Sequence, residues 1–135
     1  MSRMIFVNLP VSDLRRSIDF FTQLGFTFDP RFTDERATCL VVNDQAYVML
    51  LVNDFFGSFH DRQVADTTTH AEVLLCVSAE SRTDVDDLVD RALELGAAPS
   101  TWKEDQGFMY GRSFEDLDGH IWEVMYLDPS ALERQ

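Results

Sequence analysis

The stretch that predicts the fold is residues 7–26, VNLPVSDLRRSIDFFTQLGF. Its first residues belong to a predicted β-strand, residues 5–11. In this strand, side chains at alternate positions form an apolar face, which is typical of a strand with one face packed on helices. Ser12 or Asp13 can accept hydrogen bonds from the first N–H groups of a following helix, in which apolar residues recur at helical spacing. Gly25 suits the left-handed position at which helices often end. The stretch therefore predicts a strand, a helix and a glycine stop.

The same order returns in the second half of the chain. Residues 71–77 are an apolar alternating strand, Ser81 and Asp84 have the spacing of a capping box, and Gly96 ends the next predicted helix. Further strands are expected at 26–28, 37–42, 46–52, 97–101, 109–115 and 120–127. The turn residues Asn43 with Asp44, and Asp118 with Gly119, separate the last two strands of each half. The repeat predicts an α+β fold of two βαβββ modules.

The two predicted modules cover residues 1–53 and 70–128 of one domain, 1–135, and residues 54–69 connect them. This connecting loop holds Phe55, Phe56 and Phe59 among polar residues, and a short helix near 54–60 is expected. Long loops in small domains are often functional. The phenylalanines either cover a pocket or complete the core, and the sequence leaves both interpretations open.

The charge balance excludes some partners. The chain has 24 acidic and 11 basic residues, and its formal net charge is −13. We expect no binding to nucleic acid or to anionic membranes, since both need a basic surface. The N-terminal apolar run is too short for a signal peptide or a membrane helix, and two cysteines are too few for a disulfide framework. A cytoplasmic protein is expected.

Three stretches together resemble the vicinal oxygen chelate superfamily, and they span nearly the whole chain. They are residues 7–26, quoted above, residues 77–97, VSAESRTDVDDLVDRALELGA, and residues 111–128, GRSFEDLDGHIWEVMYLD. The superfamily includes glyoxalase I, methylmalonyl-CoA epimerase, extradiol dioxygenases, fosfomycin-resistance enzymes and bleomycin-resistance proteins. The chain departs from its usual pattern at Leu117, commonly Pro, and at Phe21, commonly Tyr. The resemblance implies a curved eight-stranded cup with helices outside, a small-molecule ligand on the concave face, and a homodimer.

The resemblance also implies up to four metal-ligand positions, one on the first and one on the last strand of each module. Counting from the shared motifs places them on Phe6, Met49, Glu72 and Glu123. Phe6 has no donor atom, and a methionine thioether is a poor ligand for a hard divalent ion. His70 shares a strand face with Glu72, so His70, Glu72 and Glu123 form a possible reduced site for Zn, Mn or Fe. Otherwise no cofactor is expected.

A second interpretation needs no metal. Glu72 and Glu123 would be catalytic carboxylates, one of which acts as a general base. The developing oxyanion would then need Tyr110 and Arg112, which share a strand face. The sequence does not decide which face that is, and Arg112 in a structural ion pair is an equal alternative.

A third interpretation is binding without chemistry. It needs a cup lined by apolar side chains with a few polar groups. The expected ligand-binding residues are Phe6, Asn8, Met49, Leu74, Tyr110, Arg112 and Met125. The leading expectation is a small-molecule-binding glyoxalase/bleomycin-resistance/dioxygenase-like protein with a degenerate metal site. A lyase or isomerase using Glu72 and Glu123, and an antibiotic-sequestering binder, are the alternatives.

Overall fold

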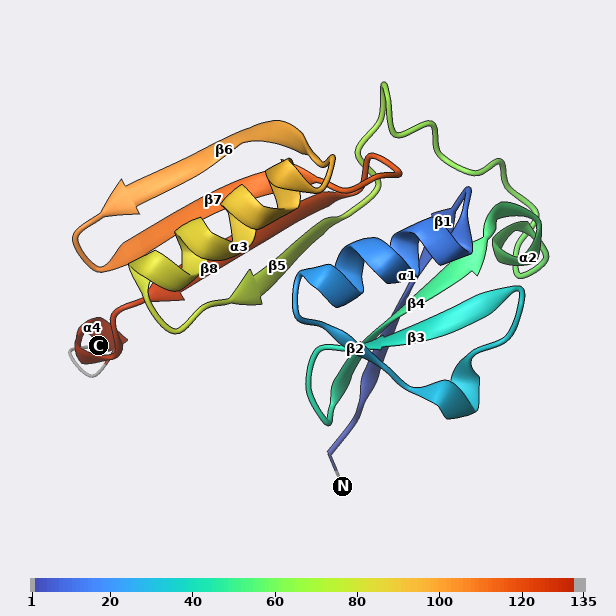
Figure 1. The fold of residues 1–135 in the computed structure, drawn as a ribbon, viewed down its shortest axis with the longest axis horizontal. Helices are drawn as coiled ribbons and strands as arrows, with labels where there is room; N and C mark the ends of the chain where they lie inside the picture. Colours follow the sequence, from blue (N-terminus) through green and yellow to red (C-terminus); the bar gives the residue numbers. More distant parts are fainter. Residues whose placement is uncertain (1, 133–135) are drawn as a thin grey trace. The chain divides into compact units, whose positions relative to one another are not determined.

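The computed structural model describes residues 2–132 (Figure 1). The chain divides into two compact units, Met1–Val64 and Ala65–Gln135, called module one and module two below. The boundary falls inside the predicted connecting loop. Each module holds a four-stranded mixed sheet with a helix on it, so the predicted α+β class and the two βαβββ modules are confirmed.

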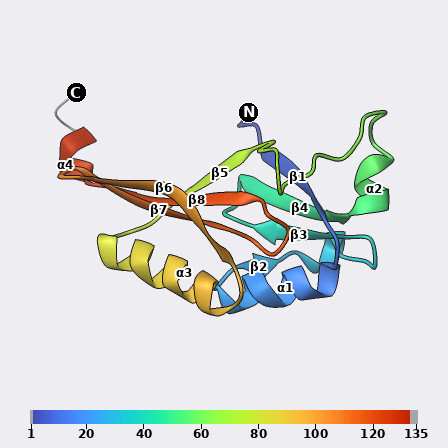
Figure 2. The same cartoon turned by 90° about the horizontal axis from the view of Figure 1, so that it is seen from above.

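Module one contains β1 (Ile5–Val11), α1 (Leu14–Gln23), β2 (Thr27–Phe28), a 3-10 turn η1 (Pro30–Phe32), β3 (Ala37–Val41), β4 (Ala46–Val52) and α2 (Asn53–Gly57). Its strand order is β1-β4-β3-β2, in which β1 and β4 are parallel and the other pairs antiparallel. The helix α1 covers one face of this sheet (Figure 2). The first and last strands of the module therefore lie side by side.

Local signals start and stop α1 as expected. The side chain of Asp13 accepts a hydrogen bond from the Arg16 N–H at 3.1 Å, and Gly25 has a φ of +99°. The core between α1 and the sheet is formed by side chains that are at most 3% exposed, among them Leu9, Phe20, Phe21, Leu40 and Leu50. At roughly 1.5–3 kcal/mol for each fully buried side chain, this core is the main source of the module's stability.

Module two contains β5 (Leu74–Ser78), α3 (Arg82–Glu94), β6 (Ala98–Gln106), β7 (Met109–Glu115), β8 (Ile121–Leu127) and α4 (Pro129–Leu132). Its strand order, β5-β8-β7-β6, repeats that of module one. Half of the predicted capping box forms, because Ser81 accepts from the Asp84 N–H at 3.0 Å. The Asp84 side chain accepts from the N–H of Glu80, the residue before the cap, rather than from that of Ser81. No helix in the described part of the chain is long and apolar enough to span a bilayer.

Two strand boundaries in module two differ from prediction. The first strand begins at Leu74 rather than at residue 71, because its pairing with β8 begins where Leu74 lies opposite Ile121. Strand β6 extends to Gln106, well beyond the predicted 97–101, and carries a register shift between Pro99 and Lys103. Glu72 consequently lies in the segment before β5.

Candidate functional site

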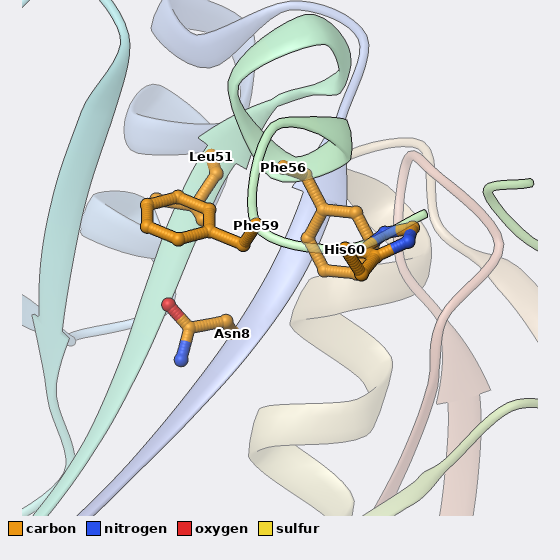
Figure 3. Close-up of a pocket in the computed structure, with 5 residues that line it drawn as sticks. All are labelled: Asn8, Leu51, Phe56, Phe59 and His60. Carbon is orange, nitrogen blue, oxygen red and sulfur yellow. The ribbon is translucent and has the colours of Figure 1, made fainter. Parts of the chain in front are cut away.

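A cavity of about 310 Å³ lies in module one, on the face of the sheet opposite α1. Figure 3 shows its lining residues, Asn8, Leu51, Phe56, Phe59 and His60. Asn8 comes from β1, Leu51 from β4, Phe56 from α2, and the last two from the residues just after α2. A volume near 300 Å³ is at the lower end of the range for small-molecule sites.

The pairing of β1 with β4 explains why these residues meet. In this parallel pair Asn8 lies opposite Met49, and Pro10 lies opposite Leu51. Both strands therefore end at the same edge of the sheet, where α2 starts directly after Val52 (Figure 1). No residue separates β4 from α2, so the aromatic residues of α2 lie over the ends of β1 and β4.

Aromatic contacts hold the residues that cover the cavity. The rings of Phe55 and Phe59 meet edge to face at 5.0 Å between centroids, and those of Phe56 and His60 at 5.2 Å. The guanidinium of Arg36 lies 4.4 Å from the centre of the Phe55 ring. Such aromatic pairs contribute roughly 0.5–1.5 kcal/mol beyond their buried area. We call residues 53–60 the aromatic lid.

Two polar side chains interrupt the apolar wall. The Asn8 amide nitrogen donates to the Phe6 carbonyl at 3.2 Å, and the Arg62 N–H donates to His60 Nδ1 at 3.0 Å. The lining holds no carboxylate, thiol or hydroxyl. This chemistry suits the binding of a mostly apolar ligand with a few directed hydrogen bonds.

The residues predicted for the site in module one are only partly brought together. Asn8 lines the cavity, whereas Phe6 and Met49 are absent from its lining. The Phe6 ring stacks on that of Tyr47 at 5.0 Å, and Phe6 is 47% exposed.

Most of the cavity lining was not among the predicted site residues. Leu51, Phe56, Phe59 and His60 were missed, although the phenylalanines of the connecting loop were noted as a possible pocket cover. The signal that could have identified the lid was this concentration of aromatic residues directly after a strand.

The two predicted catalytic carboxylates have different surroundings. Glu72 Oε1 hydrogen-bonds to Nδ1 of His120, whose side chain is 1% exposed. Glu123 lies on β8 between Cys76 of β5 and Ser113 of β7. Burial, and then the nearby Glu123 carboxylate, raise the pKa of the Cys76 thiol. Leu74 and Met125 share the sheet face of Glu123, as the alternation of the strands predicts.

Tyr110 and Arg112 face α3, on the side of the sheet opposite Glu123. The Tyr110 hydroxyl donates to Asp86 Oδ1 at 2.7 Å, and Arg112 Nη1 lies 3.0 Å from Asp86 and 2.9 Å from Asp90. The hydrogen bond from Tyr110 is the main cause that lowers the pKa of Asp86, and the same bond raises the pKa of Tyr110. Arg112 was expected either to stabilise an oxyanion or to form a structural ion pair, and in the structure it forms ion pairs with Asp86 and Asp90.

The donor set does not fit a metal ion. The described residues contain no group of three or more His, Cys, Asp or Glu side chains that could hold one. His70 Nδ1 hydrogen-bonds to its neighbour Thr69, and Glu72 is engaged by His120, so His70, Glu72 and Glu123 do not converge.

A buried polar network in module two was not predicted. Asp116 is 6% exposed and accepts hydrogen bonds from the N–H groups of Asp118 and His120 and from Trp122 Nε1. His120 directly follows the turn at residues 117–119, and its side chain is buried. The network stabilises the turn of residues 116–120. The Thr67 hydroxyl also contacts this turn, by donating a hydrogen bond to the Asp118 carbonyl.

Comparisons with known proteins agree with this fold. Residues 3–43 match the family described as bleomycin resistance protein-like N-terminal. Hypothetical protein SA1046 from S. aureus is 28% identical, with a TM-score of 0.78, over 93% of this chain and 95% of that chain. A glyoxalase/bleomycin resistance protein/dioxygenase family enzyme from Burkholderia phytofirmans PsJN is 15% identical, with a TM-score of 0.76, over 93% and 99% of the two chains.

A third similar structure is TnmS3, an antibiotic binding protein from Streptomyces sp. CB03234. It is 17% identical to this chain, with a TM-score of 0.63, over 94% of this chain and 97% of that chain. No curated protein matches the sequence. The three structural matches extend over both modules and agree with the two βαβββ modules that the sequence predicts, whereas the family match lies within module one.

Proposed function

We propose that this chain, a member of the vicinal oxygen chelate superfamily, binds a small and largely apolar aromatic molecule in the cavity of module one. The cavity itself is the observation that supports this proposal. Its volume of about 310 Å³ is some ten times the ~30 Å³ share of one water molecule, which suits a ligand with two fused rings or slightly more. Phe56 and Phe59 offer ring faces and edges to such a ligand.

The charge of the protein narrows the ligand class. A net charge of −13 repels anions and favours neutral or cationic molecules at the surface. Structural neighbours include both a protein described as antibiotic binding and one described as a lactoylglutathione lyase, so the fold is compatible with binding and with catalysis. Sequestration of an aromatic antibiotic is one form that the proposed binding would take.

The lyase or isomerase alternative has less support. It requires Glu72 and Glu123 to act on one substrate, yet Glu72 is held by the buried His120 and precedes β5. The cavity lining, for its part, has no group that could serve as a strong general base at neutral pH other than His60. Binding without chemistry therefore accounts for the described groups with fewer assumptions.

The superfamily resemblance further suggests a cytoplasmic homodimer. Light scattering on the purified full chain would measure the dimer, which is expected at about twice the chain mass of 15.5 kDa. A monomeric mass would remove this part of the proposal and leave the cavity proposal intact.

The binding proposal is tested with N-phenyl-1-naphthylamine, an uncharged dye whose fluorescence rises in apolar surroundings. The full chain should bind it saturably, and Phe59→Ser should weaken binding about fivefold, since a lost aromatic contact is worth about 1 kcal/mol. The matched control is Phe108→Ser, because Phe108 is also an exposed phenylalanine but lies in the β6–β7 turn. Equal effects of the two substitutions, or no saturable binding, would refute the proposal.

A further inference from the structure

The cavity carries a specific hydrogen-bonding pattern, which begins with Asn8. Its amide nitrogen donates to the Phe6 carbonyl within the same strand. Its amide oxygen makes no hydrogen bond to a described residue, and in Figure 3 this oxygen lies on the side of the Phe59 ring. The Phe6 carbonyl accepts only one of the two N–H groups of this amide, and the oxygen, which has two lone pairs, is left as an acceptor on the side of Phe59.

His60 provides the complementary group. Because the Arg62 N–H donates to Nδ1, a neutral His60 ring carries its proton on Nε2. The hydrogen bond from Arg62 thus fixes the tautomer, and the edge-to-face contact with Phe56 orients the ring. The Nε2–H is the ring's remaining donor, and no described residue accepts from it.

We infer that the ligand is a planar, uncharged heteroaromatic compound that donates one hydrogen bond to Asn8 Oδ1 and accepts one from His60 Nε2. This inference rests on the proposed function. The aromatic body would fill the space between Leu51, Phe56 and Phe59, an O–H or N–H group would meet Asn8, and a ring nitrogen or carbonyl would meet His60. Hydroxylated or amino-substituted nitrogen heterocycles and aromatic lactams have this combination of groups.

Four related probes separate the two hydrogen bonds from general apolar binding. The first pair is 2-naphthol and 2-methoxynaphthalene, which differ in the donor; the second is quinoline and naphthalene, which differ in the acceptor. Equilibrium dialysis against the full chain measures each dissociation constant. A net hydrogen bond should give 2-naphthol and quinoline an advantage of about three- to tenfold over their partners.

The variants then assign each advantage to one residue. Asn8→Leu should abolish the preference for 2-naphthol and keep that for quinoline, whereas His60→Phe, which retains a ring against Phe56, should do the reverse. His70→Phe is the matched control and should keep both preferences, because His70 does not line the cavity. Ratios between paired probes are compared, so a uniform change in apolar affinity does not affect the result.

The possible failures are distinguishable. If all four probes bind the wild-type chain with the same affinity, the proposed binding function survives and the hydrogen-bonding inference is wrong. If preferences exist but persist in Asn8→Leu and His60→Phe, the assignment to these residues is wrong. If none of the probes binds, the proposed function fails and this inference fails with it.

Discussion

Replacing Asp116 tests how module two is stabilised. The Asp116 carboxylate is almost fully buried, and its two oxygens accept three N–H groups at 2.9 to 3.0 Å. Asp116→Ala removes every acceptor at once. Asp116→Asn keeps one oxygen, which can still accept from the backbone N–H groups of Asp118 and His120, but its amide nitrogen faces the Trp122 N–H.

The magnitude follows from the number of donors that lose a partner. In Asp116→Ala, the buried His120 N–H and Trp122 Nε1–H both lose their acceptor, and each buried unsatisfied group costs about 1–3 kcal/mol. The substitution also removes the free-energy cost of burying the Asp116 carboxylate, which offsets part of this loss. We expect a loss of about 3 kcal/mol in the free energy of unfolding for Asp116→Ala and about half of that for Asp116→Asn.

Urea denaturation followed by far-UV circular dichroism measures these losses, and Asp34→Ala is the matched control. Asp34 Oδ1 also accepts two backbone N–H groups, from Arg36 and Ala37, but in an exposed loop where water can replace it. We expect Asp34→Ala to cost less than about 1 kcal/mol. An equally small loss for Asp116→Ala would refute the argument that burial makes these N–H groups costly to leave unpaired.

The same carboxyl group predicts a pH dependence. Burial raises the pKa of Asp116, so the folded protein keeps this proton to a higher pH than the unfolded chain does. Stability from this group is complete below the unfolded pKa of about 3.9 and is lost as the pH rises through the folded pKa. The stability difference between wild type and Asp116→Asn should therefore be largest near pH 4 and shrink toward neutral pH; a difference that grows with pH would contradict this sign.

Three further outcomes are expected in module two. Gly111→Ala should lose about 1–3 kcal/mol in urea denaturation and alter the near-UV circular dichroism, because a Cβ at this position would collide with the ring of Trp102. Asp86→Asn should lower the pKa of Tyr110 in a spectrophotometric titration, since the Asp86 carboxylate raises it; an unchanged titration would show that the hydrogen bond is absent. Glu72→Gln should lose about 1 kcal/mol, the difference between a charged and a neutral hydrogen bond to the buried histidine that Glu72 contacts, with urea denaturation as the measurement.

The fold was predictable because its signals are local and occur twice. Asp13 and Ser81 begin helices, and Gly25 and Gly96 follow them with φ values of +99° and +107°. Each of these signals acts within a few residues, so the sequence carries it directly. The repetition of the order strand, helix and three strands then indicated two modules.

The site was less predictable because it depends on contacts between distant residues. The strand that carries Tyr110 and Arg112 has polar residues on both faces, and the partner residues on α3 decide which face is which. Glu72 was assigned to a strand because the sequence does not reveal its contact with His120, 48 residues away. The sequence shows the aromatic lid as a group of phenylalanines among polar residues. Whether these phenylalanines line a cavity depends on the position of the end of β4 in the folded sheet.

The direct continuation of β4 into the aromatic lid has a consequence for how this site can vary. With no spacer between Val52 and Asn53, an inserted residue there would rotate Phe56 by about 100° around the helix axis and empty one wall of the cavity. Insertions beyond Arg62, whose N–H contacts His60, leave that geometry untouched. Homologous chains should therefore differ in length after the lid and keep a fixed count before it, so that ligand preference changes by side-chain replacement rather than by loop growth.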